Sequence, residues 1–391
     1  MDIALGAVLL IVPLLTYALL RVSLRGIRLQ RLAPSSIFEG DTAEVQLILR
    51  NTSRVPIFYP EAFEIFTPEV HEQKRVLFPA RVMPGETVVS GYRGACVLPR
   101  GEYGLGPAAI AVSDPFGWFQ LRLHVPGRET IKVYPQFDSF GLLNRSSTRG
   151  SSPQQDHARF GIGESTEFFS VREYRRGDPL RRIHWGLTAH RGFPVVREYV
   201  RPTTGNLRIY LDLYRYALVG VGRSSSLEHA VRITASLAAD ALRQGNRVRV
   251  EGEGKELLHA ATETGSGSLQ AILDLLVRVK PNGDVPYDDF LASRSGDVVA
   301  GSTVVLMVSS YLNRSPTFLD HVRSFLRSNC RVVAAIFDDT TFRSIYEPQS
   351  PGVEASQRIA ERLRILGAET VEIACAANLQ GAFRSPSRGP A

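Results

Sequence analysis

The sequence predicts a multidomain protein with an N-terminal transmembrane helix, an all-β immunoglobulin-like sandwich and a doubly wound α/β domain. Three observations lead to this fold class. Residues 3–20 contain no charged side chain. Residues 39–136 contain roughly eight short strand-like segments separated by turns, the spacing typical of a sandwich. From residue 206 onward, apolar strands alternate with amphipathic helices, which favours a parallel sheet.

Composition sets limits on the class of protein. The 391 residues suffice for two or three domains, and the 44% hydrophobic and 22% charged fractions argue against wholesale disorder. The net charge of +7 fits a membrane-facing protein or an acidic partner, and no basic run typical of nucleic-acid binding is present. Three widely spaced cysteines (Cys96, Cys330 and Cys375) exclude a disulfide framework and a cysteine metal site.

The apolar run at residues 3–20 predicts a membrane anchor. Eighteen helical residues reach about 27 Å, close to the thickness of a bilayer core. Arg21, Arg25, Arg28 and Arg31 follow this run, which predicts that the body lies in the cytoplasm. We therefore expect residues 1–31 to form an anchor and its basic flank, in a single-pass protein of the inner (cytoplasmic) membrane. The alternative is a buried core helix.

The next region has the period of β-strands. Val45, Leu47 and Leu49 alternate with polar residues over 42–50, so they share one face of a strand. Further strands are expected at 61–66, 74–78, 86–92, 94–98, 108–113, 119–125 and 129–134. We assign 32–140 to a sandwich that supports or binds, and the polar, small residues of 141–160 to a linker.

The last region, 206–380, alternates two element types. Strands are expected at 207–213, 247–250, 304–309, 332–337 and 370–374, and helices at 227–244, 268–279, 318–327 and 352–366. Several of these strands are apolar on both faces, as in a parallel sheet covered by helices on each side. Residues 381–391 are expected to be a disordered tail.

An arginine-rich signature segment, 161–205, joins the two regions. Between Arg172 and Arg201 it holds eight arginines against three acidic residues. Tyr174 and Trp185 give it apolar anchors, and residues 176–179 (Arg-Gly-Asp-Pro) read as a tight turn. The segment is therefore expected to be folded rather than a loose basic tail.

This pattern resembles the signature of a bacterial family known as domain of unknown function 58. The matching positions are Tyr174, Gly177, Asp178, Arg181, Ile183, His184, Trp185, Thr188, Ala189 and Arg191. Two turn-like pieces, Arg100-Gly101-x-Tyr103 and Asp114-Pro115-Phe116-Gly117, extend the resemblance. It implies a von Willebrand factor A-like domain from residue 206 and a partner of the MoxR type, an AAA+ ATPase. Members of that family often carry two helices where this chain has one apolar run.

Asp212, at the end of the first α/β strand, is similar to the start of a von Willebrand factor A metal motif. That motif reads D-x-S-x-S, whereas this chain has Tyr214 and Tyr216 in place of the serines and Arg215 between them. Ser309, Ser310, Asp338 and Asp339 follow later strands. We predict a degenerate metal site near Asp212, Ser309 and Asp338 and no cofactor, with Mg²⁺ as the alternative.

The resemblance and the anchor together predict a non-catalytic, membrane-anchored adaptor that works with a MoxR-type ATPase in the assembly or maturation of a client complex. Its docking surface would comprise Tyr174, Arg175, Arg176, Gly177, Asp178, Arg181, Arg182, His184, Trp185 and Arg191. Four alternatives remain. The arginines could pair internally with carboxylates of the α/β domain, His184 and Asp178 could serve a hydrolytic enzyme, and the segment could bind anionic lipid or, less expected, nucleic acid.

Overall fold

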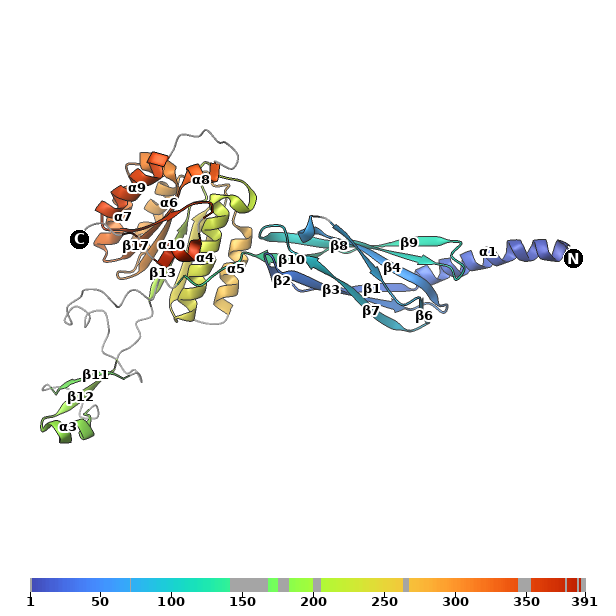
Figure 1. Ribbon diagram of the computed structural model, residues 1–391, viewed down its shortest axis with the longest axis horizontal. Helices are drawn as coiled ribbons and strands as arrows, with labels where there is room; N and C mark the ends of the chain where they lie inside the picture. The colour runs from blue at the N-terminus through green and yellow to red at the C-terminus, as the bar shows by residue number, and fades with distance from the viewer. Residues whose placement is uncertain are drawn as a thin grey trace.

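The computed structural model describes residues 2–70, 72–140, 168–174, 183–199, 205–262, 267–343, 353–376, 378–384 and 387. The N-terminal part is mostly β-sheet and the C-terminal part mixes helices with strands (Figure 1). The predicted order, a β-rich body followed by an α/β body, therefore agrees with the structure. The immunoglobulin-like assignment of the first stays a prediction.

Helix α1 (Asp2–Arg25) leads into the β-rich body. From Thr16 on it packs against that body: the Tyr17 ring meets Phe119 edge-on at 5.4 Å, and Leu20 and Ser23 are buried. A membrane-spanning helix needs about 20 consecutive apolar residues. In α1 the last residues of the apolar stretch 3–20 pack against the β-rich body instead. Among the described residues, no helix is long and apolar enough to cross a membrane. The predicted transmembrane helix over 3–20 and the single-pass membrane location are therefore wrong.

The β-rich body is a sandwich of two sheets. One sheet has the order β1 (Ile27–Leu32), β3 (Thr42–Asn51), β7 (Thr87–Ala95). The other has the order β2 (Ser36–Phe38), β10 (Glu129–Tyr134), β8 (Gly101–Ser113), β4 (Ile57–Phe66), β5 (Glu72–Leu77), with β6 (Arg81–Val82) on β4 and β9 (Gln120–Val125) on β8.

The core between the two sheets follows from the alternation in β3. Leu47 and Leu49 are fully buried and pack with Ile57 of β4 and Ile110 of β8. Strand β1 lies where a basic flank was expected, because its residues alternate in burial and pair with β3. Arg31 of β1 forms an ion pair with the fully buried side chain of Glu64, so this arginine belongs to the sandwich.

The α/β body is built on a six-stranded sheet of order β15-β14-β13-β16-β17-β18, in which β15 alone is antiparallel to its neighbour. The strands are β13 (Asn206–Leu211), β14 (Arg247–Glu253), β15 (Leu257–Thr262), β16 (Thr303–Val308), β17 (Arg331–Phe337) and β18 (Glu369–Ile373). By order of appearance this is 3-2-1-4-5-6, a doubly wound arrangement.

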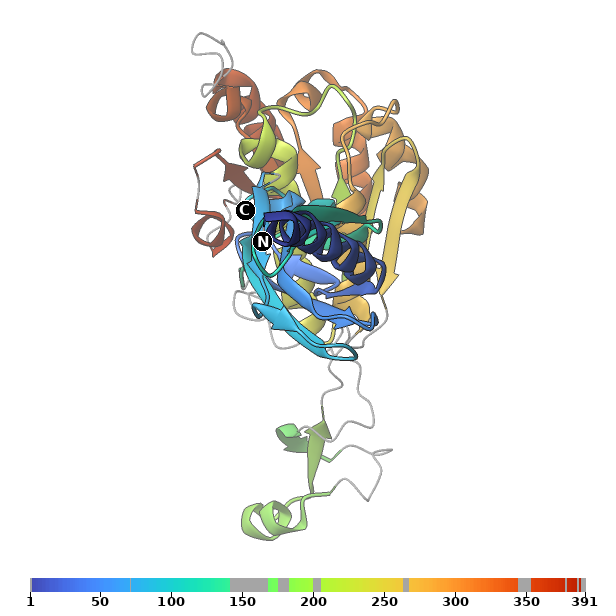
Figure 2. The same cartoon turned by 90° about the vertical axis from the view of Figure 1, so that its right-hand side faces the viewer.

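Helices cover both faces of this sheet (Figures 1 and 2). They are α4 (Ser226–Arg243), α5 (Gly267–Arg278), α6 (Tyr287–Arg294), α7 (Phe318–Arg327), α8 (Asp339–Arg343), α9 (Val353–Ile365) and α10 (Leu379–Arg384). Ile209 of β13 packs with α4 and α5, whereas its neighbour Tyr210 packs with α6 and α7. Burial on both sides explains why residues 304–308 of β16 and 332–337 of β17 are all apolar.

The sandwich meets the α/β body end-on, beside α4 and α5 (Figure 1). Arg100, just before β8, places its Nη1 atom 2.6 Å from the Leu276 carbonyl and 3.0 Å from the Val279 carbonyl at the end of α5. Its Nη2 atom lies 3.0 Å from the Glu228 carboxylate. A cation at a helix C-terminus interacts favourably with the helix dipole.

Further contacts belong to this interface, which we call the junction. Glu39, almost fully buried, pairs with Arg223 at 2.5 Å and with Arg232 at 3.3 Å. Lys132 and Tyr134 of β10 both contact the Asp274 carboxylate, at 2.7 and 2.9 Å. The junction therefore holds the sandwich on the α/β body by several charged and hydrogen-bonded pairs.

Candidate functional site

The described part of the signature segment forms a small unit of two strands and a helix. Strands β11 (Phe168–Glu173) and β12 (Val195–Tyr199) pair antiparallel, and α3 (Trp185–Arg191) precedes β12. Ile183, Val195 and Val196 are buried within it. We call residues 168–174 and 183–199 the signature unit.

His184 and Thr188 hold α3 in place. The Nδ1 atom of His184 accepts a hydrogen bond from the Leu187 amide at 3.3 Å, so His184 is the N-cap of α3. The Thr188 hydroxyl accepts from the Val195 amide at 3.0 Å and ties the helix to β12. Gly192, at φ 77°, ends the helix in the left-handed conformation that glycine favours. These contacts give His184 a structural role.

The outer surface of the signature unit carries aromatic and basic side chains. Trp185 is 68% exposed and Phe193 is 38% exposed. His190 and Arg191 are exposed as well, while Tyr174 is half-buried. The other predicted docking residues, Arg175, Arg176, Gly177, Asp178, Arg181 and Arg182, lie outside the described residues. The described surface can therefore offer a large ring and a cation to a partner.

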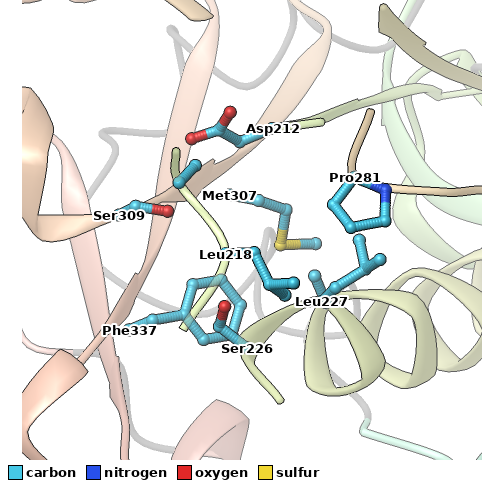
Figure 3. A pocket seen from close by; sticks show the side chains of 10 residues that line it. Asp212, Leu218, Ser226, Leu227, Pro281, Met307, Ser309 and Phe337 are labelled. Carbon is cyan, nitrogen blue, oxygen red and sulfur yellow. The ribbon is translucent and has the colours of Figure 1, made fainter. Parts of the chain in front are cut away.

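A second candidate site is a hollow at the carboxyl edge of the sheet, where β13, β16 and β17 end. Its volume is about 10 Å³, room for about one water molecule. Figure 3 shows the side chains of the ten residues that line it: Asp212, Ala217, Leu218, Ser226, Leu227, Ala230, Pro281, Met307, Ser309 and Phe337. We call it the Asp212 pocket. It brings together two predicted residues, Asp212 and Ser309, and it does not include Asp338.

Asp212 is the polar centre of this pocket. Its Oδ1 atom accepts a hydrogen bond from the Tyr214 amide at 3.2 Å, and its Oδ2 atom is buried without a hydrogen-bond partner. Burial, together with the negative charge of Asp288, raises the pKa of Asp212 to about 7. The Tyr214 amide and the hydroxyls of Ser309 and Tyr311 oppose this shift.

The residues around Asp212 do not fit a magnesium ion. Where the metal motif has serines, Tyr214 and Tyr216 pack their rings together at 5.3 Å, and Tyr214 also meets Tyr311. The Asp338 carboxylate accepts hydrogen bonds from the amide and the hydroxyl of Thr340, so it stabilises the turn after β17. Within the described ranges, no three His, Cys, Asp or Glu side chains gather at one point. Mg²⁺ prefers a near-octahedral set of oxygen ligands, which these residues do not provide.

Sequence reasoning missed the apolar walls of the pocket and the charged residues of the junction. Leu218 and Met307 have the character of ordinary loop and strand residues, because no local sequence pattern identifies a residue that lines a pocket. Arg100 did carry a signal, because it lies in a piece that resembles a known family, but that piece was interpreted as a turn.

Comparisons with known proteins give a partial match. The chain is 25% identical over 234 residues to "Uncharacterized protein YeaD" of Bacillus subtilis, covering 57% of this chain and 54% of that protein. The chain thus spans about half the length of the curated relative it matches.

Solved structures resemble only parts of the chain. They include the CARDB domain of a Pyrococcus furiosus protein (12% identity, TM-score 0.21, 27% of this chain and 86% of that one) and a cohesin module from Clostridium perfringens (11%, TM-score 0.21, 28% and 98%). Scores this low carry no argument about fold or function. The von Willebrand factor A-like assignment stays a prediction. The family match covers the signature unit and most of the α/β sheet: residues 170–341 match the model of the family described as "Protein of unknown function DUF58".

Proposed function

We propose that the protein is a non-catalytic adaptor that docks a partner protein on the signature unit. The observation that carries this proposal is the exposed Trp185 ring at the start of a helix held by its own N-cap and by β12. Tryptophan, tyrosine and arginine are the residues that most often dominate protein-binding energy. Because the backbone that carries this ring is already held in place, binding requires little ordering of the main chain.

The junction supports an adaptor role. Arg100, Glu39 and Asp274 tie the sandwich to the α/β body through paired charges. A protein that positions a partner relative to a second body needs such a fixed connection. His184, which caps α3, is committed to structure through Nδ1, and this favours the adaptor over the hydrolytic alternative.

The proposed partner is an AAA+ ATPase of the MoxR type. Support for this partner comes from the family resemblance, and the arginine-rich composition of the segment adds that the contacted patch would be acidic. The adaptor would present that ATPase to a client complex during assembly or maturation.

The test compares the two tryptophans of the chain. Trp185→Ser should weaken binding of the full-length protein to the MoxR-type ATPase of the same organism by roughly thirtyfold, the effect of a residue worth about 2 kcal/mol. Trp118→Ser is the matched control, since Trp118 is also exposed (53%) but lies on the sandwich. Isothermal titration calorimetry measures both. Equal losses in the two variants would contradict docking on the signature unit, and a wild-type protein that fails to bind would exclude this ATPase.

A further inference from the structure

The strands at the edges of the described sheets differ in how they are protected from other chains. An edge strand exposes unpaired main-chain N–H and C=O groups, and charged side chains usually keep a foreign strand from pairing with them. The strands with one described neighbour, or at the end of a sheet, are β1, β2, β5, β6, β7, β9, β11, β12, β15 and β18. All but β2 and β15 contain at least one Asp, Glu, Lys or Arg, and β2 has only three residues. Among the described strands, β15 is therefore the one longer edge strand without such a charge.

Strand β15 has the sequence LLHAAT over residues 257–262 and forms one end of the six-stranded sheet. Leu258 and Ala260 pack against the core of the α/β body, whereas Leu257, His259 and Ala261 are exposed on the other face. The Leu257 side chain is 44% exposed. In Figure 2 the strands of this end of the sheet, drawn in yellow, stand at the right-hand margin of the α/β body. The outer edge of β15 is therefore apolar and open.

The opposite end of the same sheet is closed by the chain itself. The Thr370 amide of β18 donates to the Ser387 carbonyl at 3.0 Å, and the Thr370 carbonyl accepts from the Ser387 amide at 2.9 Å. The Arg364 side chain also contacts Thr370 and Glu372, so this edge carries charges. Within the described ranges, β15 pairs with β14 alone. The two ends of the sheet therefore differ both in main-chain pairing and in charge.

We propose that β15 pairs antiparallel with β15 of a second copy of this chain, so that the two sheets join into one across a two-fold axis. Identical strands can pair in this way because each copy offers the same N–H and C=O groups to the other. The strand contains no Asp, Glu, Lys or Arg, so the pairing brings no such like charges together, and it places the exposed Leu257 beside the other copy. The inference does not depend on the adaptor function, but such a dimer would present two signature units.

A strand of a different protein is the competing occupant, since main-chain pairing is available to any extended segment. The second copy is favoured because the contact is isologous: the same open, uncharged edge supplies both sides. No other described edge strand longer than three residues offers such a match, because each of them carries a charged residue.

The first experiment measures the mass of the full-length protein by sedimentation velocity between roughly 1 and 100 µM, since dimer formation depends on protomer concentration. We expect an equilibrium between monomer and dimer. Ala261→Lys should weaken dimerisation by roughly tenfold or more, because the substitution places a like charge on both copies at the paired edge. Leu77→Lys is the matched control, since Leu77 is an exposed residue (60%) of β5, an edge strand that already carries charges. Equal melting temperatures of the variants would show that both remain folded.

The second experiment locates the two-fold axis. Residues directly opposite each other in an antiparallel pair point to the same face, so two-fold pairing of identical strands places one residue opposite its own copy. Single cysteine substitutions at residues 257–261 should therefore include one that forms a disulfide between copies under mild oxidation, because opposed Cα atoms lie about 4.5–5.5 Å apart. Leu77→Cys and the wild-type protein, with its own three cysteines, are the controls.

Several results would overturn the inference. A wild-type protein that stays monomeric over the whole concentration range would exclude the dimer. A dimer that is unchanged in Ala261→Lys and gives no crosslink in the cysteine series would place the contact on another surface. Equal losses in Ala261→Lys and Leu77→Lys would show a general effect of added charge. Because ATPase binding is measured separately, a β15 dimer that binds no ATPase would keep this inference and remove the adaptor.

Discussion

The buried carboxylate of Asp212 lowers the stability of the folded protein when it is ionised. Its carboxylate sits at the end of a buried strand and has one oxygen without a partner, so burial shifts its pKa from 3.8 to about 7. Between these values the folded state binds a proton that the unfolded chain has released. Stability therefore falls as the pH rises through this window.

We predict that Asp212→Asn removes this pH dependence. The raised pKa corresponds to at most roughly 4 kcal/mol between pH 4 and pH 7, and less if water reaches the pocket. The two proteins should be similarly stable at pH 4.5, while the variant should unfold at higher urea concentration at pH 8. Urea midpoints measured across this range check the prediction, and parallel curves for the two proteins would contradict it.

Helix α4 is the element on which the junction and the pocket both depend. Its outer residues Glu228 and Arg232 pair with Arg100 and Glu39, and its first turn supplies Ser226 and Leu227 to the pocket. Ser225 is the N-cap of this helix, and its hydroxyl accepts a hydrogen bond from the Glu228 amide at 3.3 Å. A change at this cap should therefore weaken the α/β body.

Ser225→Ala should lower the free energy of unfolding by about 1 kcal/mol, whereas Ser225→Gly should cost only a few tenths, because glycine is tolerated at the N-cap. Chemical denaturation of the three proteins measures the difference. If alanine and glycine are equally harmful, Ser225 acts through packing and not as a cap.

At the scale of the whole molecule, the junction decides whether the sandwich and the α/β body move together. Arg100 is its central residue, with a side chain only 4% exposed. Burial lowers the pKa of its guanidinium, and the Glu228 carboxylate opposes that shift. Removing one partner of a buried charged pair leaves the other uncompensated.

Arg100→Ala should destabilise the protein by about 3–5 kcal/mol, the usual effect of breaking a buried ion pair. It should also broaden the distribution of distances between the two bodies, as measured by small-angle scattering. Arg93→Ala is the control, since Arg93 also pairs with a glutamate, Glu44, but at the surface of the sandwich. A variant that is destabilised with an unchanged scattering curve would place the role of Arg100 inside one body.

The regular elements could be predicted because their signals are local. Val45, Leu47 and Leu49 mark β3 by alternation, and α7 spans the expected residues 318–327. Strands β1, β2, β6 and β15 were missed, since they are short or half-exposed and are defined by the strand beside them. Residues 381–384, expected in a disordered tail, lie in α10, where the buried Phe383 ring stacks on Phe140 at 4.9 Å. The transmembrane prediction was wrong because an apolar helix can pack against protein as well as against lipid. Tyr17 and Leu20 pack on the sandwich.

The candidate site was predicted in part for the same reason. Asp212 and Ser309 could be found because each ends an apolar strand, and the ends of parallel strands meet at one edge of a sheet. The pocket walls could not be found, because Leu218, Pro281 and Met307 come from three segments that meet only through the sheet order.

The sequence by itself determined most strands of both parts and the helices α4, α5, α7 and α9, that the chain has a β-rich part followed by an α/β part, and that Asp212 stands at a strand end. Hydrophobic period and turn residues act over a few positions, so they can be read along the chain. Tertiary structure alone decided the end of α1, the use of Arg31 and Arg100 as buried partners, and the unpaired oxygen of Asp212. Burial and charge pairing depend on residues that are far apart in the sequence. Arg31 and Glu64 are 33 positions apart, and Arg100 and Leu276 are 176 positions apart.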